Sequence, residues 1–339
     1  MKILLLQLKR IGDLILTLPA VATVRENFPD AQLTLVVSKE CAEILPAISN
    51  VDRILIARRN LRDLSPSFAV ARGAFNYCID FTRNDRSAFL AFLSRARKRV
   101  TSYRVHDQSR NRARAYTDLV NVRMRDMHII DYHLALLEPL GIHKVIGELR
   151  LKLPTTARER ADHLLRNAGI GSRFVIFHPG SAREEKLWDP ARWAQVIDEA
   201  GRRNDIDLVL TGGVSRLEEE HVARIKRRTR QRVVDLSTKT DLLTLAALIE
   251  QARLLVTVDS APMHLAAATY TPQVALFGPT NPFHWRPRGS PALILQGKSA
   301  IPLGEFSPSR PRFAMSQIST GAVINAMESL LSHHATAHI

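Results

Sequence analysis

The feature that most constrains the fold is a short aliphatic run that ends in a polar turn and continues as a helix. Leu254–Val258 is aliphatic without regular alternation, which is typical of a strand buried on both faces of a parallel sheet. Asp259, Ser260 and Ala261 follow. The next helical pattern, Pro262–Thr269, begins with a proline, which suits a first helical turn. The pattern predicts a strand–turn–helix unit of an α/β protein.

The polar residues of this turn occupy a position where α/β proteins bind ligands. Such sites lie beyond the carboxyl ends of parallel strands, and the free N–H groups of a following helix can hold a phosphate. His264 lies in the first turn of the predicted helix. The alternative is structural: Asp259 or Ser260 caps the helix and His264 packs in the core. The turn by itself leaves both interpretations open.

A second strand-to-helix turn lies near the N-terminus. Ile3–Leu6 is another buried-strand run, and the chain then turns through Lys9, Arg10 and Gly12 into an apolar helical pattern. Asp13 falls near the start of that helix, where the helix dipole favours a negative charge. Its alternative role is a simple helix cap. Acid-bearing turns in both halves of the chain suggest two domains with a cleft between them.

Strand and helix patterns alternate along the chain, which predicts parallel sheets with helices on both faces. In the first half, we expect strands at Lys2–Gln7, Gln32–Val37, Arg53–Ile56 and Tyr77–Asp80, and helices at Leu14–Asn27 and at Asp131–Leu140, the latter ending at Gly141. In the second half, we expect strands at Phe174–Phe177, Asp207–Leu210, Arg232–Asp235, Leu254–Val258 and Gln273–Phe277. The helices there are Pro190–Arg203, Ser215–Arg230, Leu242–Ala252, Pro262–Thr269 and a last one at Thr320–Ser332. The extended segment Gly147–Thr156 is the predicted linker.

Positive charge is concentrated in one part of the chain. The formal net charge is +15 over 339 residues, and residues 83–128 contain twelve Lys or Arg against four acids. This basic segment attracts polyanions: nucleic acid, an anionic membrane surface or a phosphorylated glycolipid. Within it, we expect the apolar side chains of Phe89–Leu93 to face the core, and the following cations to remain in solvent, available to a membrane. The region from Arg83 to Asp126 has the least regular pattern and predicts functional loops.

Missing motifs disfavour several classes of protein. No dinucleotide-binding Gly-X-Gly-X-X-Gly follows a predicted strand, and neither a P-loop nor a Gly-X-Ser-X-Gly nucleophile elbow occurs. No nucleic-acid-binding module is visible, and aromatic residues make up only 6% of the chain, which disfavours base stacking. Cys41 and Cys78 lack the spacing of a metal site. Lys9 and Arg10 interrupt the first apolar run too early for a signal peptide, and no run is long enough for a membrane span.

The two turns together resemble glycosyltransferase family 9, the ADP-heptose:lipopolysaccharide heptosyltransferases. That family has Gly-Asp-X-X-X-X-Leu-Pro near its start, similar to Gly12–Pro19, and a late Asp-(Ser/Thr)-Gly-X-X-His, similar to Asp259–His264. Further similar stretches are Phe177–Ser181, Lys186–Trp188, Leu210–Gly213 and Ala275–Thr280. The resemblance implies a GT-B fold, in which two Rossmann-like domains face a central cleft that holds the active site. Residues 1–150 would bind the acceptor and residues 151–339 the nucleotide sugar, with the last helix packing back on the first domain.

The resemblance also implies roles for individual residues. Asp13 would be the base that deprotonates the acceptor hydroxyl, and Lys9 and Arg10 would bind the acceptor beside it. The leaving diphosphate needs fixed donors and a cation. The residues expected to bind the donor are Gly180, Ser181, Lys186, Asp259, Ser260, Ala261 and His264. In other enzymes of this fold, an acid after the third strand of the second domain holds the ribose. Here Glu218, Glu219 and Glu220 are the candidates, and the alternative is that they form an acidic helix face.

Two features depart from the family pattern. Ala261 replaces the usual glycine, so a positive φ at this position would be costly. The loop Ala182–Glu185 before Lys186 is acidic. Both features bear on which nucleotide sugar is the donor, and they bear less on the fold.

The resemblance predicts an inverting glycosyltransferase that needs no metal or other cofactor. It would move heptose from ADP-heptose to the inner core of lipopolysaccharide, as a peripheral protein on the cytoplasmic face of the inner membrane, without binding nucleic acid. The basic segment would attract the phosphates and acidic sugars of the acceptor. One alternative is transfer of another nucleotide sugar to a different envelope glycan, and another is a non-catalytic basic protein that binds polyanions or membranes. The acceptor hydroxyl, the core position and the oligomeric state stay open.

Overall fold

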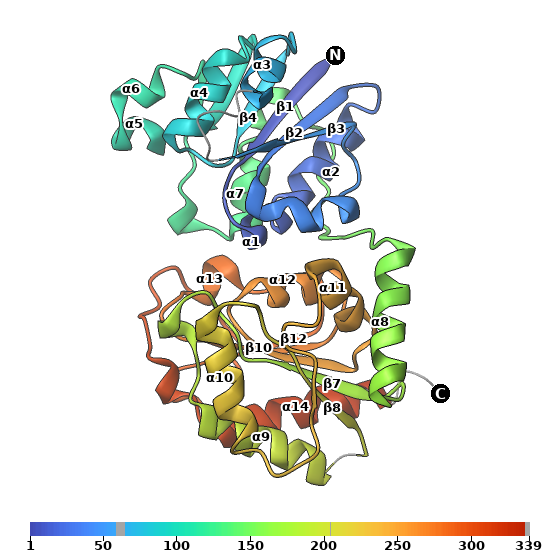
Figure 1. The fold of residues 1–339 in the computed structure, drawn as a ribbon. Helices are drawn as coiled ribbons and strands as arrows, with labels where there is room; N and C mark the ends of the chain where they lie inside the picture. The colour runs from blue at the N-terminus through green and yellow to red at the C-terminus, as the bar shows by residue number, and fades with distance from the viewer. Residues whose placement is uncertain (59–64, 204, 336–339) are drawn as a thin grey trace. The chain divides into compact units, whose positions relative to one another are not determined.

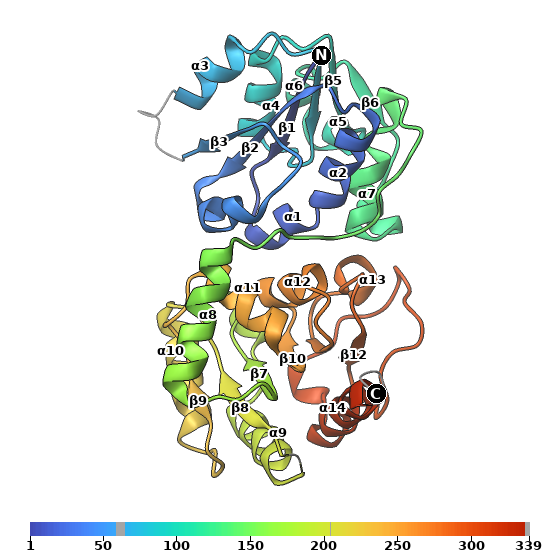
Figure 2. The ribbon, with the colours of Figure 1, turned by 90° about the vertical axis from the view of Figure 1, so that its right-hand side faces the viewer.

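The computed structural model describes residues 1–58, 65–203 and 205–335 (Figures 1 and 2). The chain divides into two compact units, Met1–Lys152 and Leu153–Ile339, within two residues of the predicted boundary. In the described part of the chain, each unit is built around one parallel sheet of six strands with helices packed on it. The two units and their parallel sheets confirm the predicted GT-B class with two Rossmann-like domains.

The sheet of the first unit has the strand order β3-β2-β1-β4-β5-β6. Its strands are β1 (Lys2–Gln7), β2 (Gln32–Ser38), β3 (Arg53–Ala57), β4 (Tyr77–Asp80), β5 (Lys98–Ser102) and β6 (Asp118–Val120). The chain builds outward from β1 to β3 and then returns to add β4 on the other side of β1. This reversal between β1 and β4 is a topological switch point, the place where open α/β sheets bind ligands.

The sheet of the second unit repeats the same topology, with the order β12-β11-β10-β7-β8-β9. Its strands are β7 (Phe174–His178), β8 (Asp207–Leu210), β9 (Val234–Asp235), β10 (Leu254–Val258), β11 (Gln273–Phe277) and β12 (Ala292–Gln296). The chain builds outward from β7 to β9 and returns to β10 beside β7. The switch point of this sheet therefore lies between β7 and β10.

Helices connect the strands in both units. Those of the first unit are α1 (Ile11–Ile15), α2 (Leu18–Asn27), α3 (Ser65–Ala71), α4 (Asp85–Leu93), α5 (Arg104–Gln108), α6 (Arg110–Ala113) and α7 (Ile129–Ala135). Those of the second unit are α8 (Thr155–Ala168), α9 (Pro190–Arg203), α10 (Arg216–Lys226), α11 (Leu242–Gln251), α12 (Ala261–Ala268), α13 (Pro282–Trp285) and α14 (Thr320–Ala335). Short 3₁₀ turns occur at η1 (Lys39–Ala47), η2 (Met124–Asp126), η3 (Glu138–Leu140), η4 (Glu184–Lys186) and η5 (Met315–Gln317).

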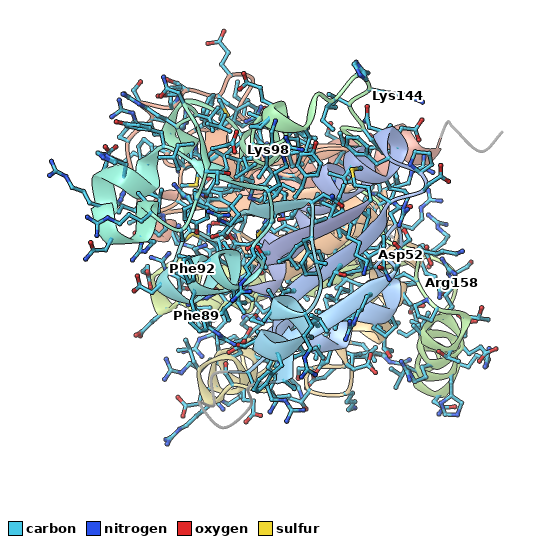
Figure 3. All side chains as sticks on the ribbon, turned by 90° about the horizontal axis from the view of Figure 1, so that it is seen from above. Asp52, Phe89, Phe92, Lys98, Lys144 and Arg158 are labelled. Carbon is cyan, nitrogen blue, oxygen red and sulfur yellow. The ribbon has the colours of Figure 1, made fainter. Side chains whose placement is uncertain are left out.

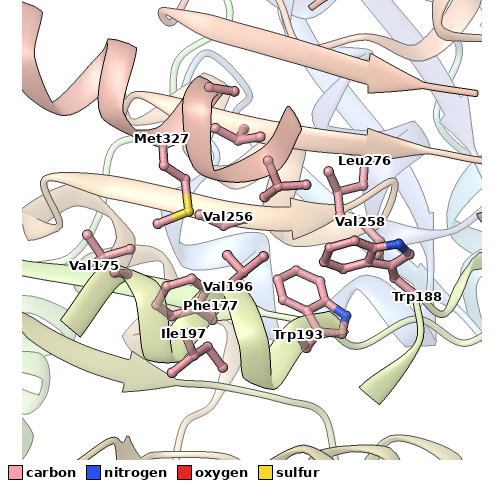
Figure 4. Close-up of a cluster of buried hydrophobic side chains, with 14 of the residues drawn as sticks. Val175, Phe177, Trp188, Trp193, Val196, Ile197, Val256, Val258, Leu276 and Met327 are labelled. Atoms are coloured by element: carbon pink, nitrogen blue, oxygen red, sulfur yellow. The ribbon is translucent and has the colours of Figure 1, made fainter. Parts of the chain in front are cut away.

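The core of the second unit is centred on two tryptophans (Figure 4). Trp188 and Trp193 are fully buried, and their rings meet edge to face with centroids 5.3 Å apart. The indole Nε1 of Trp188 donates to the carbonyl of Ile318 over 3.2 Å. Because Trp188 follows η4 by two residues, this anchor fixes the turn that carries Lys186.

The last helix, α14, packs within the second unit, against α9 and against β10, β11 and β12. Val323, Ala326 and Met327 are buried in the same core as the tryptophans. Burial of these side chains explains why α14 belongs to this sheet, whereas the resemblance implied that the last helix packs on the first domain.

The predicted helix Leu14–Asn27 is divided into α1 and α2. Thr17 is the N-cap of α2, and Pro19 lies in its first turn. Proline has no N–H, and its ring would clash with the carbonyl four residues earlier in a continuous helix, so the chain starts a new helix here. The predicted end at Gly141 is confirmed, since this residue has the left-handed conformation at φ 67°.

The basic region from Arg83 to Asp126 is more regular than predicted, because it contains α4, β5, α5, α6 and β6. Cations at the start of β5 conceal the strand pattern in the sequence. The ammonium group of Lys98 donates to the carbonyl of Pro139 over 2.8 Å, and Arg99 Nε donates to the carbonyl of Ala115 over 2.7 Å. These hydrogen bonds let charged side chains lie within a sheet.

The prediction that the apolar side chains of Phe89–Leu93 all face the core is wrong for two of them. Leu90 and Ala91 are buried, but Phe89 is 54% exposed and Phe92 is 62% exposed (Figure 3). The two phenylalanines are three residues apart on α4 and therefore share one helix face. No helix in the described ranges is both long and apolar enough to cross a membrane.

Candidate active site

The N-terminal turn places Lys9, Arg10 and Asp13 at the switch point of the first sheet. Lys9 and Arg10 follow the carboxyl end of β1, and Asp13 lies in the first turn of α1. Arg10 is the N-cap residue, and no side chain caps this helix. The simple capping role for Asp13 is therefore not seen. Its carboxylate instead lies 3.8 Å from the ammonium group of Lys9.

Burial dominates the electrostatics of Asp13. The side chain is only 18% exposed, and desolvation raises the pKa of its carboxyl group, while Lys9 and Arg10 act in the opposite direction. Burial also lowers the pKa of Lys9, although Asp13 opposes this shift. A carboxylate with a raised pKa is a better proton acceptor than an exposed aspartate.

A buried polar network beneath α1 holds the backbone of Asp13. The hydroxyl of Thr17 donates to the Asp13 carbonyl over 2.8 Å and accepts from Gln7 Nε2 over 2.7 Å. His133 Nδ1 lies 3.1 Å from the Leu16 carbonyl, so this nitrogen must carry the proton and donate. Burial lowers the pKa of His133 to about 3, so the ring is neutral. Sequence reasoning missed this network, for which a glutamine at the end of an aliphatic strand was the only signal.

The turn after β4 supports the turn after β1. The hydroxyl of Thr82 accepts a hydrogen bond from the backbone N–H of Leu8 over 2.7 Å. The fully buried carboxylate of Asp80 accepts from the N–H groups of Thr82 and Arg83 and from the Tyr116 hydroxyl. Two adjacent strand ends are thus tied together at the switch point, which limits the movement of the residues that follow β1.

In the second unit, a buried ion pair joins the two predicted donor motifs. The ammonium group of Lys186 lies 2.7 Å from Asp259 Oδ2 and donates to the Asp259 carbonyl over 3.1 Å. The two side chains are 14% and 8% exposed. Lys186 comes from the turn after β7 and Asp259 from the end of β10, so the pair lies at the switch point of this sheet.

The start of α12 offers hydrogen-bonding groups that lack protein partners. Ser260 is the N-cap residue, but its side chain makes no capping bond, and its buried hydroxyl has no partner. His264 Nδ1 is likewise buried without a partner, and burial lowers the pKa of His264 to about 4. Ala261 is the first helical residue and does not have a positive φ, so the expected conformational cost of alanine does not arise. The structural alternative of a capped helix start is not seen.

A third group lies around two glycine turns. Gly180 and Ser181 follow β7 and are buried, and Gly213 follows β8. A Cβ atom at Gly180 or Gly213 would collide with the carboxylate of Glu218, so this acid lies against both turns. The neighbouring acids differ: Glu219 is exposed, and Glu220 pairs with Arg216 over 2.7 Å. Of the three candidate acids, the structure brings Glu218 beside the glycine turns.

The first unit presents a partly buried carboxylate, and the second unit separately presents groups that could bind an anion. A lysine, a free hydroxyl, a neutral imidazole and a helix N-terminus together suit a diphosphate. Within the described ranges, no cluster of three or more His, Cys, Asp or Glu side chains could hold a metal ion. The groups of the second unit fit the diphosphate of a nucleotide-activated donor.

Two solved structures similar to this chain are glycosyltransferases. A glycosyl transferase family 9 structure from Veillonella parvula is similar with a TM-score of 0.84 and 25% identity, covering 98% of this chain and 97% of that one. An ADP-heptose lipopolysaccharide heptosyltransferase II structure from Escherichia coli shares the fold with a TM-score of 0.79 at 17% identity, over 99% and 100% of the two chains. The fold and site therefore define a glycosyltransferase of the GT-B class.

The family follows from the sequence comparisons. The family model described as glycosyltransferase family 9 (heptosyltransferase) matches residues 68–301. Lipopolysaccharide heptosyltransferase 3 of Escherichia coli is 28% identical over 285 residues, which cover 81% of this chain and 83% of that protein. This chain belongs to glycosyltransferase family 9. Its membership favours an enzyme over the non-catalytic binding protein considered above.

We expect Lys186→Met to destabilise the second unit, because it leaves the Asp259 carboxylate buried without a counter-charge. The expected loss is roughly 3–5 kcal/mol in the free energy of unfolding, measured by urea denaturation. Adding Asp259→Asn to this variant should restore part of the loss. Lys226→Met is the matched control, because its ion pair with Asp235 is more exposed (45% and 24%) and should contribute no more than about 1 kcal/mol. If both lysine substitutions lowered the free energy of unfolding equally, Lys186 would not be needed to compensate the buried Asp259 carboxylate.

Proposed function

We propose that this protein is an inverting heptosyltransferase that moves heptose from ADP-heptose to the inner core of lipopolysaccharide. Family membership and the likeness to lipopolysaccharide heptosyltransferase 3 support heptose as the transferred sugar and lipopolysaccharide as the acceptor. The observation that carries the proposal is the pair of polar turns at the two switch points. One presents the Asp13 carboxylate, and the other presents Lys186 beside the start of α12.

In the proposed reaction, Asp13 accepts the proton of the acceptor hydroxyl while the acceptor oxygen forms a bond to the anomeric carbon. The bond between that carbon and the diphosphate oxygen breaks, and ADP leaves with the electron pair. Attack opposite the leaving group inverts the anomeric configuration. Lys9 and Arg10 lie beside Asp13 and would hold the acceptor through its negatively charged groups.

The second unit would stabilise the negative charge that develops on the leaving diphosphate. Lys186 supplies a positive charge, and we propose that it takes the place of a metal ion in this role. The Ser260 hydroxyl and the N–H of Ala261 would donate to phosphate oxygens, as would groups around Gly180 and Ser181. His264 is neutral and can donate one hydrogen bond to a phosphate or to the sugar.

Glu218 would bind the ribose of the donor. Its carboxylate lies against the turns after β7 and β8, at the carboxyl edge of the sheet. Carboxylates at this edge accept hydrogen bonds from ribose hydroxyls in other nucleotide-binding α/β folds. Transfer of a different nucleotide sugar to another envelope glycan would use the same residues. The experiment must therefore establish which nucleobase the donor carries.

We also propose that the protein acts as a peripheral protein on the cytoplasmic face of the inner membrane. A glycolipid acceptor is anchored in the bilayer, so the enzyme must approach the membrane surface. Phe89 and Phe92 are exposed on one face of α4, and Arg95 follows that helix. Exposed aromatic rings next to cations bind the interface of an anionic bilayer.

We expect Asp13→Asn to reduce heptose transfer by roughly 10²–10⁴-fold, because the amide cannot accept the proton. Stabilisation by ADP should remain, since donor binding is assigned to other residues. In the wild type, kcat/KM should fall with decreasing pH as Asp13 becomes protonated, and the raised pKa places this loss above the usual range of an aspartate. The exposed Asp30→Asn is the control. Near-normal turnover of Asp13→Asn would remove Asp13 from the role of base.

We expect ADP and ADP-heptose to raise the melting temperature more than UDP or GDP, because a ligand that binds only the folded state stabilises it. Glu218→Gln should weaken the ADP effect, whereas Glu219→Gln, which changes an exposed neighbour, should leave it intact. Activity should persist in EDTA if Lys186 replaces a metal. Preference for UDP or GDP would contradict the proposed donor, and no response to any nucleotide would contradict nucleotide-sugar transfer.

We expect the protein to sediment with vesicles that contain phosphatidylglycerol and to bind neutral vesicles weakly. Replacing both phenylalanines (Phe89→Ser with Phe92→Ser) should lower vesicle binding several-fold, because the helix loses its apolar contact. Val214→Ser is the matched control, since Val214 is an exposed apolar residue of the second unit. Equal binding of neutral and anionic vesicles, or no effect of the double substitution, would contradict this mode of attachment.

A further inference from the structure

A cavity of about 800 Å³ lies in the first unit beside the turns that follow β5 and β6. Tyr103 and Arg104 line it at the start of α5. Asn121, Arg123 and Arg125 line it from the segment after β6. Neither the predicted donor-binding residues nor the acceptor-binding residues Lys9 and Arg10 line this cavity, so the proposed mechanism does not yet use it.

The charge of the cavity lining is strongly positive. Three arginines face one acid of the lining, Asp107. Arg125 lies 3.5 Å from its neighbour Asp126, whereas neither Arg104 nor Arg123 forms an ion pair with any residue that the structure describes. Unpaired guanidinium groups bind phosphate and carboxylate groups in two-point contacts. The cavity is therefore suited to an anionic ligand.

The remaining lining residues suit a sugar. Tyr103 is 44% exposed, and its ring stacks on His106 with ring centroids 5.3 Å apart. The amides of Gln108 and Asn121 also line the cavity and can bond to hydroxyl groups. The lining therefore offers one aromatic face for a sugar ring and several groups that can bond to hydroxyl or anionic groups.

The cavity lies at the same edge of the sheet as Asp13. Tyr103 and Asn121 immediately follow β5 and β6, and Lys9 follows β1 by two residues. Because all six strands are parallel, their carboxyl ends share one edge. Neighbouring strands are about 4.8 Å apart, so the β1 end is separated from the β5 and β6 ends by roughly 10 and 14 Å. An oligosaccharide of a few sugars spans that distance.

We propose that this cavity is a subsite for a phosphate or carboxylate group on an acceptor sugar remote from the hydroxyl that is glycosylated. Arg104 and Arg123 would bind the anionic group, and Tyr103 would contact the sugar that carries it. This inference rests on the proposed function, because it assumes an acidic glycan as acceptor. It narrows the general attraction of the basic segment to one cavity with named contacts.

The test measures binding of a delipidated, phosphorylated core oligosaccharide by isothermal titration, in the absence of donor. Arg104→Gln and Arg123→Gln should each raise the Kd roughly tenfold, as expected for loss of a charge-assisted contact. Arg114→Gln is the matched control, because Arg114 is an exposed arginine of the same basic segment that does not line the cavity. Its Kd should stay close to that of the wild type.

Binding measurements with chemically treated oligosaccharide identify which anionic group the cavity binds. If treatment of the oligosaccharide with phosphatase abolishes the difference between wild type and variants, the group is a phosphate. If reduction of the carboxyl groups abolishes it instead, the group is a carboxylate, and either result supports the proposal. Inorganic phosphate that binds as tightly as the oligosaccharide would overturn it, since the cavity would then be a small-anion site. Unchanged binding by the two variants, or equal weakening by Arg114→Gln, would also overturn it.

Because no donor is present, this titration is independent of heptose transfer. If the wild type binds the oligosaccharide through Arg104 and Arg123 but transfers no heptose from ADP-heptose, the proposed function fails while the subsite stands. If transfer occurs and the arginine variants bind normally, the subsite fails while the proposed function stands.

Discussion

The geometry of parallel strands is the constraint on which both units depend. A parallel strand must be followed by a crossover, so all strands of a sheet end at one edge and each end leads into a turn. Where the order of the chain reverses, two crossovers diverge and leave the turns open to a ligand. In this protein the reversals lie between β1 and β4 and between β7 and β10. The Asp13 turn follows one of these strands, and the Asp259 turn follows another.

Burial gives these turns their chemical properties. A charged group that is removed from water needs a partner or changes its pKa. Lys186 and Asp259 satisfy each other, whereas Asp13 lies 3.8 Å from Lys9 and has a raised pKa, because burial outweighs the effects of Lys9 and Arg10. Neutral polar groups hold the turn in place, as the hydrogen bond from Thr17 to the Asp13 carbonyl shows. The same physical effect thus pairs two charges in the second unit and raises the pKa of a carboxyl group in the first.

The sequence predicted the buried strands well, because their aliphatic composition depends little on the rest of the fold. β10 was predicted with its exact limits and β5 was missed, since Lys98 and Arg99 conceal its pattern and are satisfied only by carbonyls from distant segments. Phe89 and Phe92 were predicted inside, because a pattern of apolar residues does not show which face of a helix finds a neighbour. Contacts between segments distant in the sequence determine both the position of β5 and the exposure of the two phenylalanines.

The sequence by itself determined the class of the fold, the two polar turns and the residues most expected to act in them, because each depends on local order along the chain. The tertiary structure decided which side chains meet. It brought Glu218 rather than Glu219 to the glycine turns, and it joined Lys186 to Asp259 across 73 positions of sequence. It also formed the cavity at Tyr103 from two separate strand ends. Such contacts depend on strand order and helix rotation, which are set by packing across the whole unit.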